Sequence, residues 1–430
     1  MASLLKASST TLVTTVLITV IGFFTSIITA RILGPEGRGL LSGALLIATL
    51  AGNAAIFGLA NTFVYHQGAE KGFNYKIFFV FSLLFIAFLA ACFAYFGLQL
   101  SSETQLHQQL YLIVLMAIVS GGYSYFNALS QLNHELRFFN AMRFGLVAGN
   151  LLLIAVIILS FESMSFVQIL IAQIVVSGFL MLCGILWARK NTIWLNHHRS
   201  HSNATWQDML GYGIKHHGTV MLSILLVNFD KLALLKMGTI VEYGFYALAF
   251  TTSRLIGAVQ EATSTALYAK FAGKDIEQLS TSVNQVFRVT FIPMLTLAAI
   301  GAAISPWFIP FIYGEAFSSM TIPFAILLFE CVIGGASWTL AQRFNAGGRP
   351  GLVFFRQFIS VIPVLLTLPF LPHDNITIYL SGLMLLGAIL RLSVTLGIYP
   401  YVLKEPTPKL LPNKADIQLA LNFINVNRSR

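Results

Sequence analysis

Apolar stretches alternate with short polar connections along almost the whole chain, and each is about 20 residues long, the length that a helix needs to cross the hydrocarbon core of a bilayer. Turn-forming residues mark many of the connections, for example Gly34-Pro35 and Gly347-Gly348. The pattern predicts an all-α polytopic membrane protein with about twelve transmembrane helices. The predicted spans are residues 12–33, 39–65, 77–98, 109–130, 141–160, 165–187, 212–236, 243–269, 287–312, 319–342, 351–371 and 376–403.

The composition of the chain agrees with this pattern and excludes an ordinary soluble protein. Hydrophobic residues make up 57% of the 430 residues and charged residues only 10%, whereas soluble domains are about one-quarter charged. The net charge of +10 would favour a nucleic-acid partner in a soluble protein, but in a membrane protein basic residues fix the orientation. We therefore expect membrane lipids around the chain and no nucleic acid. Three cysteines in apolar stretches, Cys92, Cys183 and Cys331, predict no disulfide framework.

The distribution of Lys and Arg predicts which connections face the cytoplasm. With the N-terminus cytoplasmic, 20 of the 26 basic residues fall on the cytoplasmic side, Arg356 among them. Arg31, Arg38 and Lys236 fall on the opposite side, and three more basic residues lie within the predicted spans. Because cytoplasmic connections carry such an excess in membrane proteins, we expect both termini in the cytoplasm.

A polar connector divides the predicted spans into two sets of six. Each set begins on the cytoplasmic side, so the two would be parallel repeats about an axis along the membrane normal. Residues 30–40 and 233–245 support this, since each has an apolar run, a glycine, a short link and a second glycine. The predicted divisions are an N-terminal lobe at 1–187, a cytoplasmic connector at 188–210, a C-terminal lobe at 211–403 and a cytoplasmic tail at 404–430.

The sequence shows no motif for nucleotide or metal chemistry. Gly273-Lys274 lacks the Ser or Thr that follows in a phosphate-binding loop. His197, His198 and His201 lie in the polar connector, where a solvated loop near anionic lipid headgroups explains them. We therefore expect no cofactor, no bound metal and no enzymatic site.

Charged residues inside the predicted spans are the candidate functional residues. Each charge costs about 2.5–3.5 kcal/mol at the middle of the bilayer, so each must face another charge or an aqueous cavity. Two explanations stay open: an ion-pair network that locks the helices together, and a polar central cavity that two asparagines of the second span also line. The residues are Asp230, Lys231, Arg254, Glu261, Glu330 and Arg391, with the asparagines Asn53 and Asn61.

Their spacing predicts that the partners of these charges come from other helices. Arg254 and Glu261 share a helix face but lie about 10 Å apart along the axis, and Asp230 and Lys231 point to different sides of one turn. Glu330 lies in an apolar stretch without a neighbouring base. Because an uncompensated buried carboxyl group takes up a proton readily, we expect Glu330 to be a protonation switch and Asp230 to suit a structural or sodium-binding role.

Four glycine-containing segments follow one another along most of the chain. They are residues 30–39 (ARILGPEGRG), Asp230 with Gly238 and residues 244–247 (GFYA), residues 312–317 (IYGEAF) and residues 345–350 (NAGGRP). In order and spacing the segments resemble the polysaccharide and O-antigen flippases of the multidrug/oligosaccharidyl-lipid/polysaccharide (MOP) exporter superfamily. The sequence departs from that family at Arg38, where an aromatic residue is usual.

The resemblance implies two six-helix lobes around a central cavity that opens alternately to either side of a bacterial inner membrane. It implies that the substrate is an oligosaccharide on undecaprenyl pyrophosphate, such as an O-antigen unit of lipopolysaccharide biosynthesis, and that polysaccharide assembly proteins are partners. Arginine suits a pyrophosphate group because it binds phosphate oxygens bidentately. We expect substrate binding by Arg31, Asn53, Asn61, Lys231, Arg254 and Arg391, and coupling-ion binding by Asp230, Glu261 and Glu330.

Two functions of other classes stay open. A membrane-embedded O-unit polymerase or glycosyltransferase would carry catalytic residues on a large outward loop, and the predicted outward loops are all short. A drug/cation antiporter on the same fold would have an acidic and aromatic site, whereas three bases accompany the three intramembrane acids of this chain.

Overall fold

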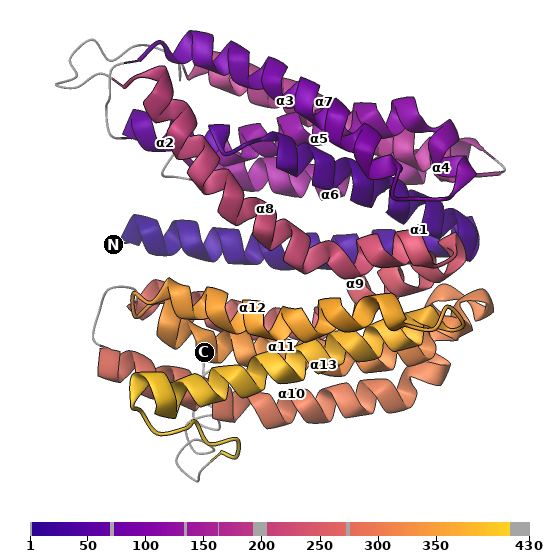
Figure 1. Cartoon of the computed structure of the whole chain (residues 1–430). Helices are drawn as coiled ribbons and strands as arrows, with labels where there is room; N and C mark the ends of the chain where they lie inside the picture. The colour runs from indigo at the N-terminus through magenta and orange to yellow at the C-terminus, as the bar shows by residue number, and fades with distance from the viewer. Residues whose placement is uncertain are drawn as a thin grey trace. The chain divides into compact units, whose positions relative to one another are not determined.

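Helices form nearly all of the part of the chain that the structure describes. The structure, a computed structural model, describes residues 2–68, 73–132, 136–161, 163–191, 204–271 and 276–412, and these residues contain no strand (Figure 1). They divide into two compact units, Met1–Gly244 and Phe245–Arg430. The predicted all-α class is confirmed.

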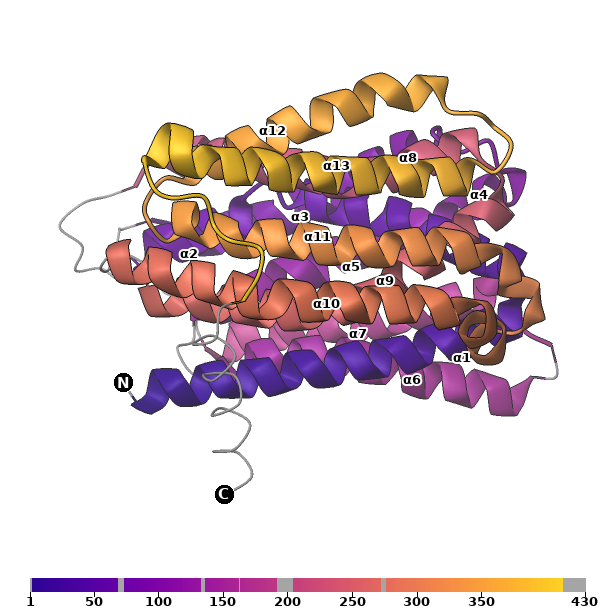
Figure 2. The same cartoon turned by 90° about the horizontal axis from the view of Figure 1, so that it is seen from below.

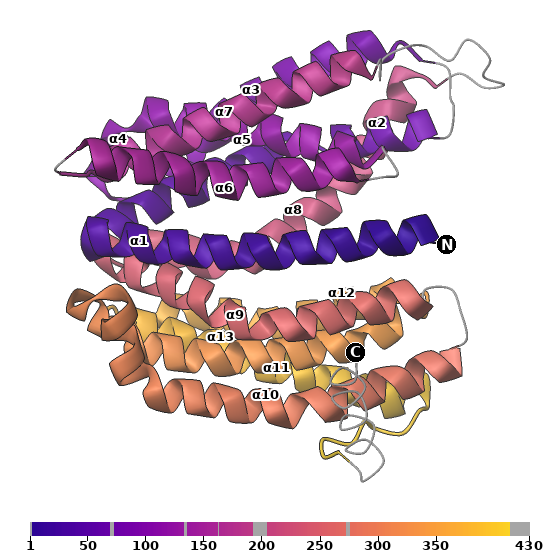
Figure 3. The same cartoon turned by 180° about the vertical axis from the view of Figure 1, so that it is seen from behind.

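The first unit is built around α1, which contacts α3, α5, α6 and α7, while α2 contacts α8. Figure 3 shows the N-terminal half of α1 running along α6. There the hydroxyl groups of Thr11 and Thr15 accept hydrogen bonds from Asn140 (3.0 Å) and Arg143 (3.3 Å) of α6. The helices are α1 (Ala2–Ala55), α2 (Leu59–Gly68), α3 (Tyr75–Leu98), α4 (Thr104–Gln108), α5 (Leu110–Leu129), α6 (Arg137–Ser160), α7 (Phe166–Lys190) and α8 (Trp206–Met237).

The α1 helix is interrupted at Gly34, where φ is 66° and ψ is −178°. Only glycine adopts this combination without strain. Beyond the interruption, Arg38 donates hydrogen bonds to Thr29 Oγ1 (3.0 Å) and Ser26 Oγ (3.2 Å). In a straight helix Arg38 and Ser26 would lie about 18 Å apart, so the chain reverses at Gly34. This reversal separates the predicted spans 12–33 and 39–65.

The second unit is built around α11, which contacts α10, α12 and α13. Figure 2 shows α11 lying between α10 and α13. Hydrogen bonds also join α11 to α9, from Gln260 to the Val332 carbonyl (3.1 Å) and between Ser264 and Thr339 (3.0 Å). The helices are α9 (Ile240–Phe271), which begins in the first unit, α10 (Ile276–Tyr313), α11 (Thr321–Asn345), α12 (Pro350–Thr367) and α13 (Ile376–Ile398).

An ion pair joins the segment after α13 to α11 within the second unit. The Glu405 carboxylate pairs with Arg343 of α11 and accepts a hydrogen bond from Ser280 of α10 at 2.6 Å. Tyr399 donates a hydrogen bond to the Leu340 carbonyl at 3.1 Å. The start of the predicted tail is therefore bound to the ends of α10 and α11.

Nine helical stretches in the described ranges are long and apolar enough to cross a membrane, and one of them joins α1 and α2. The α8 and α9 helices overlap the predicted spans 212–236 and 243–269 but are not among the nine, and both carry several charged residues. The class of polytopic membrane protein is confirmed, and the count of twelve spans stays a prediction.

The lobe boundaries also stay a prediction. In the sequence, the boundary between the two compact units follows Gly244, whereas the predicted lobes are separated by the connector at 188–210. Residues 192–203 of that connector, with its three histidines, lie outside the described residues, as do residues 413–430 of the predicted tail.

Candidate functional site

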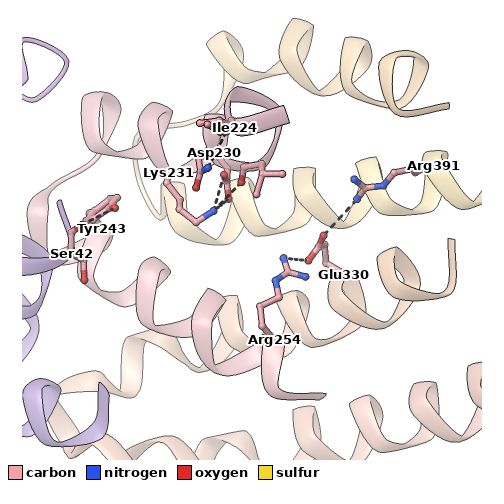
Figure 4. A network of polar contacts seen from close by, with 10 residues as sticks. Ser42, Ile224, Asp230, Lys231, Tyr243, Arg254, Glu330 and Arg391 are labelled. Carbon is pink, nitrogen blue, oxygen red and sulfur yellow. Dashed lines mark hydrogen bonds and ion pairs between the residues drawn. The ribbon is translucent and has the colours of Figure 1, made fainter. Parts of the chain in front are cut away.

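Glu330 lies between two arginines from other helices in the second unit. Its carboxylate on α11 is 2.5 Å from Arg254 Nη2 of α9 and 3.7 Å from Arg391 Nη2 of α13. Figure 4 shows the three side chains converging from their helices. Glu330 is therefore the interhelical partner of both Arg254 and Arg391, as the sequence predicted that partners would come from other helices.

The surroundings of Glu330 differ from its local sequence. That sequence is an apolar stretch without an adjacent base, and the structure adds two guanidinium groups from other helices. These groups come from helices far away in the sequence, so the local apolar stretch gave no sign of them. The reason for preferring Glu330 over Asp230 as a protonation switch is therefore lost.

A fourth charged residue, Arg356, lies close to this group and was wrongly placed among the cytoplasmic basic residues. It is within α12, is only 2% exposed, and donates hydrogen bonds to Ser337 Oγ of α11 (2.7 Å) and Thr395 Oγ1 of α13 (3.5 Å). Its guanidinium also lies 5.6 Å from the centre of the Trp338 ring. The predicted span 351–371 contained Arg356, so its interior position could have been recognised from the sequence.

We call Arg254, Glu330, Arg356 and Arg391 the arginine cluster. Within the described residues it sets three guanidinium groups against one carboxylate, since Arg356 has no acidic partner there. Nε of Arg356 and Nε of Arg391 are buried without a hydrogen-bond partner. Buried charges are costly unless they are paired and hydrogen-bonded. The cluster is therefore suited to receive an anion.

The Arg254 side chain is the most exposed member of the arginine cluster. It is 34% exposed, against 21% for Arg391 and 4% for Glu330. Its guanidinium lies 4.1 Å from the centre of the Phe250 ring, one turn earlier on α9, and a cation over an aromatic face is attracted to it. Phe250 and Glu330 together hold Arg254 in place. Arg391 also donates a hydrogen bond to Gln357 Oε1 of α12 at 3.2 Å.

In the first unit, Lys231 pairs with its neighbour Asp230. Lys231 Nζ lies 3.3 Å from Asp230 Oδ1 and donates a hydrogen bond to the Val227 carbonyl at 3.1 Å (Figure 4). Both residues are buried. The prediction that the two side chains point apart was therefore wrong, because the long lysine side chain folds back onto its own helix.

Three of the remaining predicted site residues belong to the first unit, and Glu261 belongs to the second. Arg31 is exposed at the end of the first half of α1, and Asn53 and Asn61 lie on either side of the break at Ile56–Gly58 that separates α1 from α2. Glu261 on α9 is exposed. Of the predicted site residues in the second unit, the structure brings Arg254, Glu330 and Arg391 together.

The two similar segments, residues 30–40 and 233–245, are in contact in the first unit. A side chain at Gly39 would lie 1.9 Å from the Ile240 carbonyl oxygen, and one at Gly244 would lie 2.5 Å from the Pro35 carbonyl oxygen. Tyr243 also donates a hydrogen bond to the Ser42 carbonyl at 3.5 Å (Figure 4). The glycines of both segments therefore allow backbone contact at the Gly34 reversal.

The fold resembles that of known transporters and flippases. The lipid II flippase MurJ in an inward closed conformation is 13% identical, with a TM-score of 0.69 and coverage of 95% of this chain and 89% of that one. An inward-facing multidrug resistance MATE transporter of the MOP superfamily is 14% identical, with a TM-score of 0.59 and coverage of 88% and 92%. A mutant of the MATE transporter VcmN of Vibrio cholerae is 14% identical, with a TM-score of 0.55 and coverage of 94% and 99%.

These similarities show that the chain has the fold of these transporters and flippases. The family model described as polysaccharide biosynthesis protein matches residues 28–322. The chain belongs to this polysaccharide biosynthesis family, which confirms the resemblance seen in the sequence motifs. No curated protein matches the chain.

Proposed function

We propose that the protein flips an undecaprenyl-pyrophosphate-linked oligosaccharide, such as an O-antigen or other surface polysaccharide unit, across the bacterial inner membrane by alternating access. The observation that carries this proposal is the arginine cluster, with three guanidinium groups and one carboxylate within the helices of the second unit. A pyrophosphate group has the concentrated negative charge that this excess favours. Membership of the polysaccharide biosynthesis family supports an oligosaccharide as the attached cargo.

Flipping by the purified protein tests the proposal directly. The full chain is reconstituted into vesicles that contain a labelled undecaprenyl-pyrophosphate-linked oligosaccharide in one leaflet, and an impermeant lectin reports its arrival in the other leaflet. We expect transfer above that of protein-free vesicles, and little transfer of the same sugar on an uncharged lipid. Equal transfer of the charged and uncharged lipids would contradict recognition of the pyrophosphate.

A drug/cation antiporter is the second candidate, and the similarity of the fold to MATE transporters favours it. The arginine cluster argues against it, because a cationic substrate would be repelled by the excess of guanidinium groups. Uptake of a lipophilic cationic dye by the same vesicles separates the two functions. A polymerase would instead be indicated by complete but unpolymerised units on the outer face of cells that lack the protein.

The proposed flipping is driven by an ion gradient, by coupling to later polymerisation or by carrier mass action. For an ion gradient, Asp230, Glu261 and Glu330 are the candidate carboxylates. An imposed pH gradient or sodium gradient across the vesicles will change the flipping rate of the wild-type protein if that ion is coupled to transport. Gln or Asn replacements at each of the three positions then identify the coupled carboxylate, since the flipping rate of the responsible variant no longer responds to the imposed gradient.

We also propose that both termini and the connector at 188–210 lie in the cytoplasm, because basic residues gather on that side of the predicted spans. Single cysteines at Ser200 and Ser319, in a background without Cys92, Cys183 and Cys331, test this orientation. A membrane-impermeant thiol reagent added to intact spheroplasts should label the cysteine at 319 and leave the one at 200 unlabelled. The reverse pattern would contradict the orientation.

A further inference from the structure

The arginine cluster has more donor groups than acceptors. Its one carboxylate, that of Glu330, contacts arginines from two helices. The two contacts are unequal: 2.5 Å to Arg254 and 3.7 Å to Arg391. Arg391 and Arg356 each keep a buried Nε without a hydrogen-bond partner. A single carboxylate has only two oxygens, so it satisfies only part of this donor set.

The exposures of the side chains give the order in which an anion would meet them. The Arg254 side chain is 34% exposed and that of Arg391 is 21% exposed, whereas the Glu330 side chain is 4% exposed. An incoming phosphate oxygen therefore reaches the same guanidinium groups that Glu330 already occupies. The phosphate and the carboxylate compete for Arg254, because both are anions attracted to the same guanidinium group.

We propose that Glu330 is an internal substitute for the substrate anion, which holds Arg254 while the site is empty and is displaced from it when a phosphate group binds. The displaced carboxylate moves to Arg391, whose Nη2 is already 3.7 Å away and whose Nε is without a partner. This inference rests on the proposed function and adds to it the means by which binding is sensed.

The displacement would change which helices the ion pair of Glu330 joins. In the empty state the shortest ion pair of the arginine cluster joins α9 to α11, and after displacement the carboxylate would join α11 to α13 alone. Arg356 already joins α12 to α11 and α13 through Ser337 and Thr395, so these three helices stay connected. The binding of an anion would therefore remove the ion pair between α9 and α11, while the Gln260–Val332 and Ser264–Thr339 hydrogen bonds between these helices stay in place.

Binding of inorganic pyrophosphate to the purified full chain tests the displacement. Glu330→Gln removes the competing charge and keeps the shape of the side chain, so the Kd for pyrophosphate should fall. Couplings of this kind typically change affinity by about 5- to 150-fold, and we expect a decrease in Kd of about tenfold. Glu330→Asp, which keeps the charge but is too short to hold Arg254 as closely, should give a smaller decrease and serves if Glu330→Gln does not fold.

Two controls distinguish displacement from a general gain of positive charge. Glu315→Gln removes an exposed carboxylate from the same unit and should leave the Kd unchanged. The gain in affinity from Glu330→Gln should disappear in the Arg254→Ala background, because there is no longer a shared arginine. An equal gain in that background, or in Glu315→Gln, would overturn the proposal.

The flipping assay on the same preparations separates this inference from the proposed function. Flipping by the wild type together with an unchanged or higher Kd in both Glu330 variants overturns the displacement alone. Absence of pyrophosphate binding in the wild type and in the variants also overturns the displacement. Absence of flipping of the lipid-linked oligosaccharide by the wild type refutes the proposed function, whatever the Kd values are.

Discussion

Replacement of Arg254 by alanine will lower the flipping rate of the proposed substrate by at least about tenfold, because a hydrogen bond to a charged group contributes about 1.5–3 kcal/mol and 1.4 kcal/mol corresponds to a factor of ten. Arg254 is the most exposed guanidinium of the arginine cluster, and Phe250 and Glu330 hold it in place. Arg254→Lys keeps the charge but loses the planar fork of donors, so we expect an intermediate rate.

The matched control is Arg189→Ala, which removes an exposed arginine from the last turn of α7 and should leave the flipping rate close to that of the wild type. Size-exclusion chromatography of the purified variants verifies folding, since loss of Arg254 leaves Glu330 with its more distant partner Arg391 alone. If folded Arg254→Ala flips the substrate at the wild-type rate, Arg254 serves only to hold the helices together.

The second large effect is expected from Gly39→Ala. The added Cβ would lie 1.9 Å from the Ile240 carbonyl oxygen and 2.9 Å from the Ile240 carbonyl carbon, so the two backbone segments must move apart. Overpacking of this kind typically costs about 1–3 kcal/mol. We expect a lower thermal unfolding temperature of the purified protein in detergent, and a similar decrease for Gly244→Ala, whose Cβ would meet the Pro35 carbonyl oxygen at 2.5 Å.

Alanine substitutions at two further glycines of α1 distinguish the effect of a steric clash from the effect of backbone strain. Gly22 has no atom within 4 Å of an added Cβ, so Gly22→Ala should not lower the unfolding temperature. Gly34 also has free space around it but has a φ of 66°, and Gly34→Ala should cost about 1–3 kcal/mol through backbone strain alone. Because Gly39 and Gly244 belong to one contact, their double variant should be less destabilised than the two single effects added together. Unfolding temperatures for Gly39→Ala and Gly22→Ala that match would contradict the close backbone contact.

The hydropathy pattern by itself determined the fold class and the places of the helices. Runs of about 20 apolar residues are a local property that the bilayer imposes on the chain, and the predicted spans fall on helices of the structure. The reversal at Gly34-Pro35 was also predictable, because the left-handed backbone conformation there requires glycine. This turn is also the first of the four glycine-containing segments whose order and spacing resemble the flippase family.

The partners of the buried charges were decided by the tertiary structure alone. Arg254, Glu330 and Arg391 come from three helices, and helical periodicity gives the face on which a residue lies but not the helix that packs against that face. For the same reason the apolar sequence around Glu330 gave no sign of the two arginines that lie next to it. Lys231 is the opposite case, in which the flexibility of one side chain overrode the directions that the helix geometry predicted. The backbone contacts of Gly39 with Ile240 and of Gly244 with Pro35 likewise depend on how two turns that are distant in the sequence pack together. The repeated glycine pattern showed that the two segments are similar but not that they are in contact.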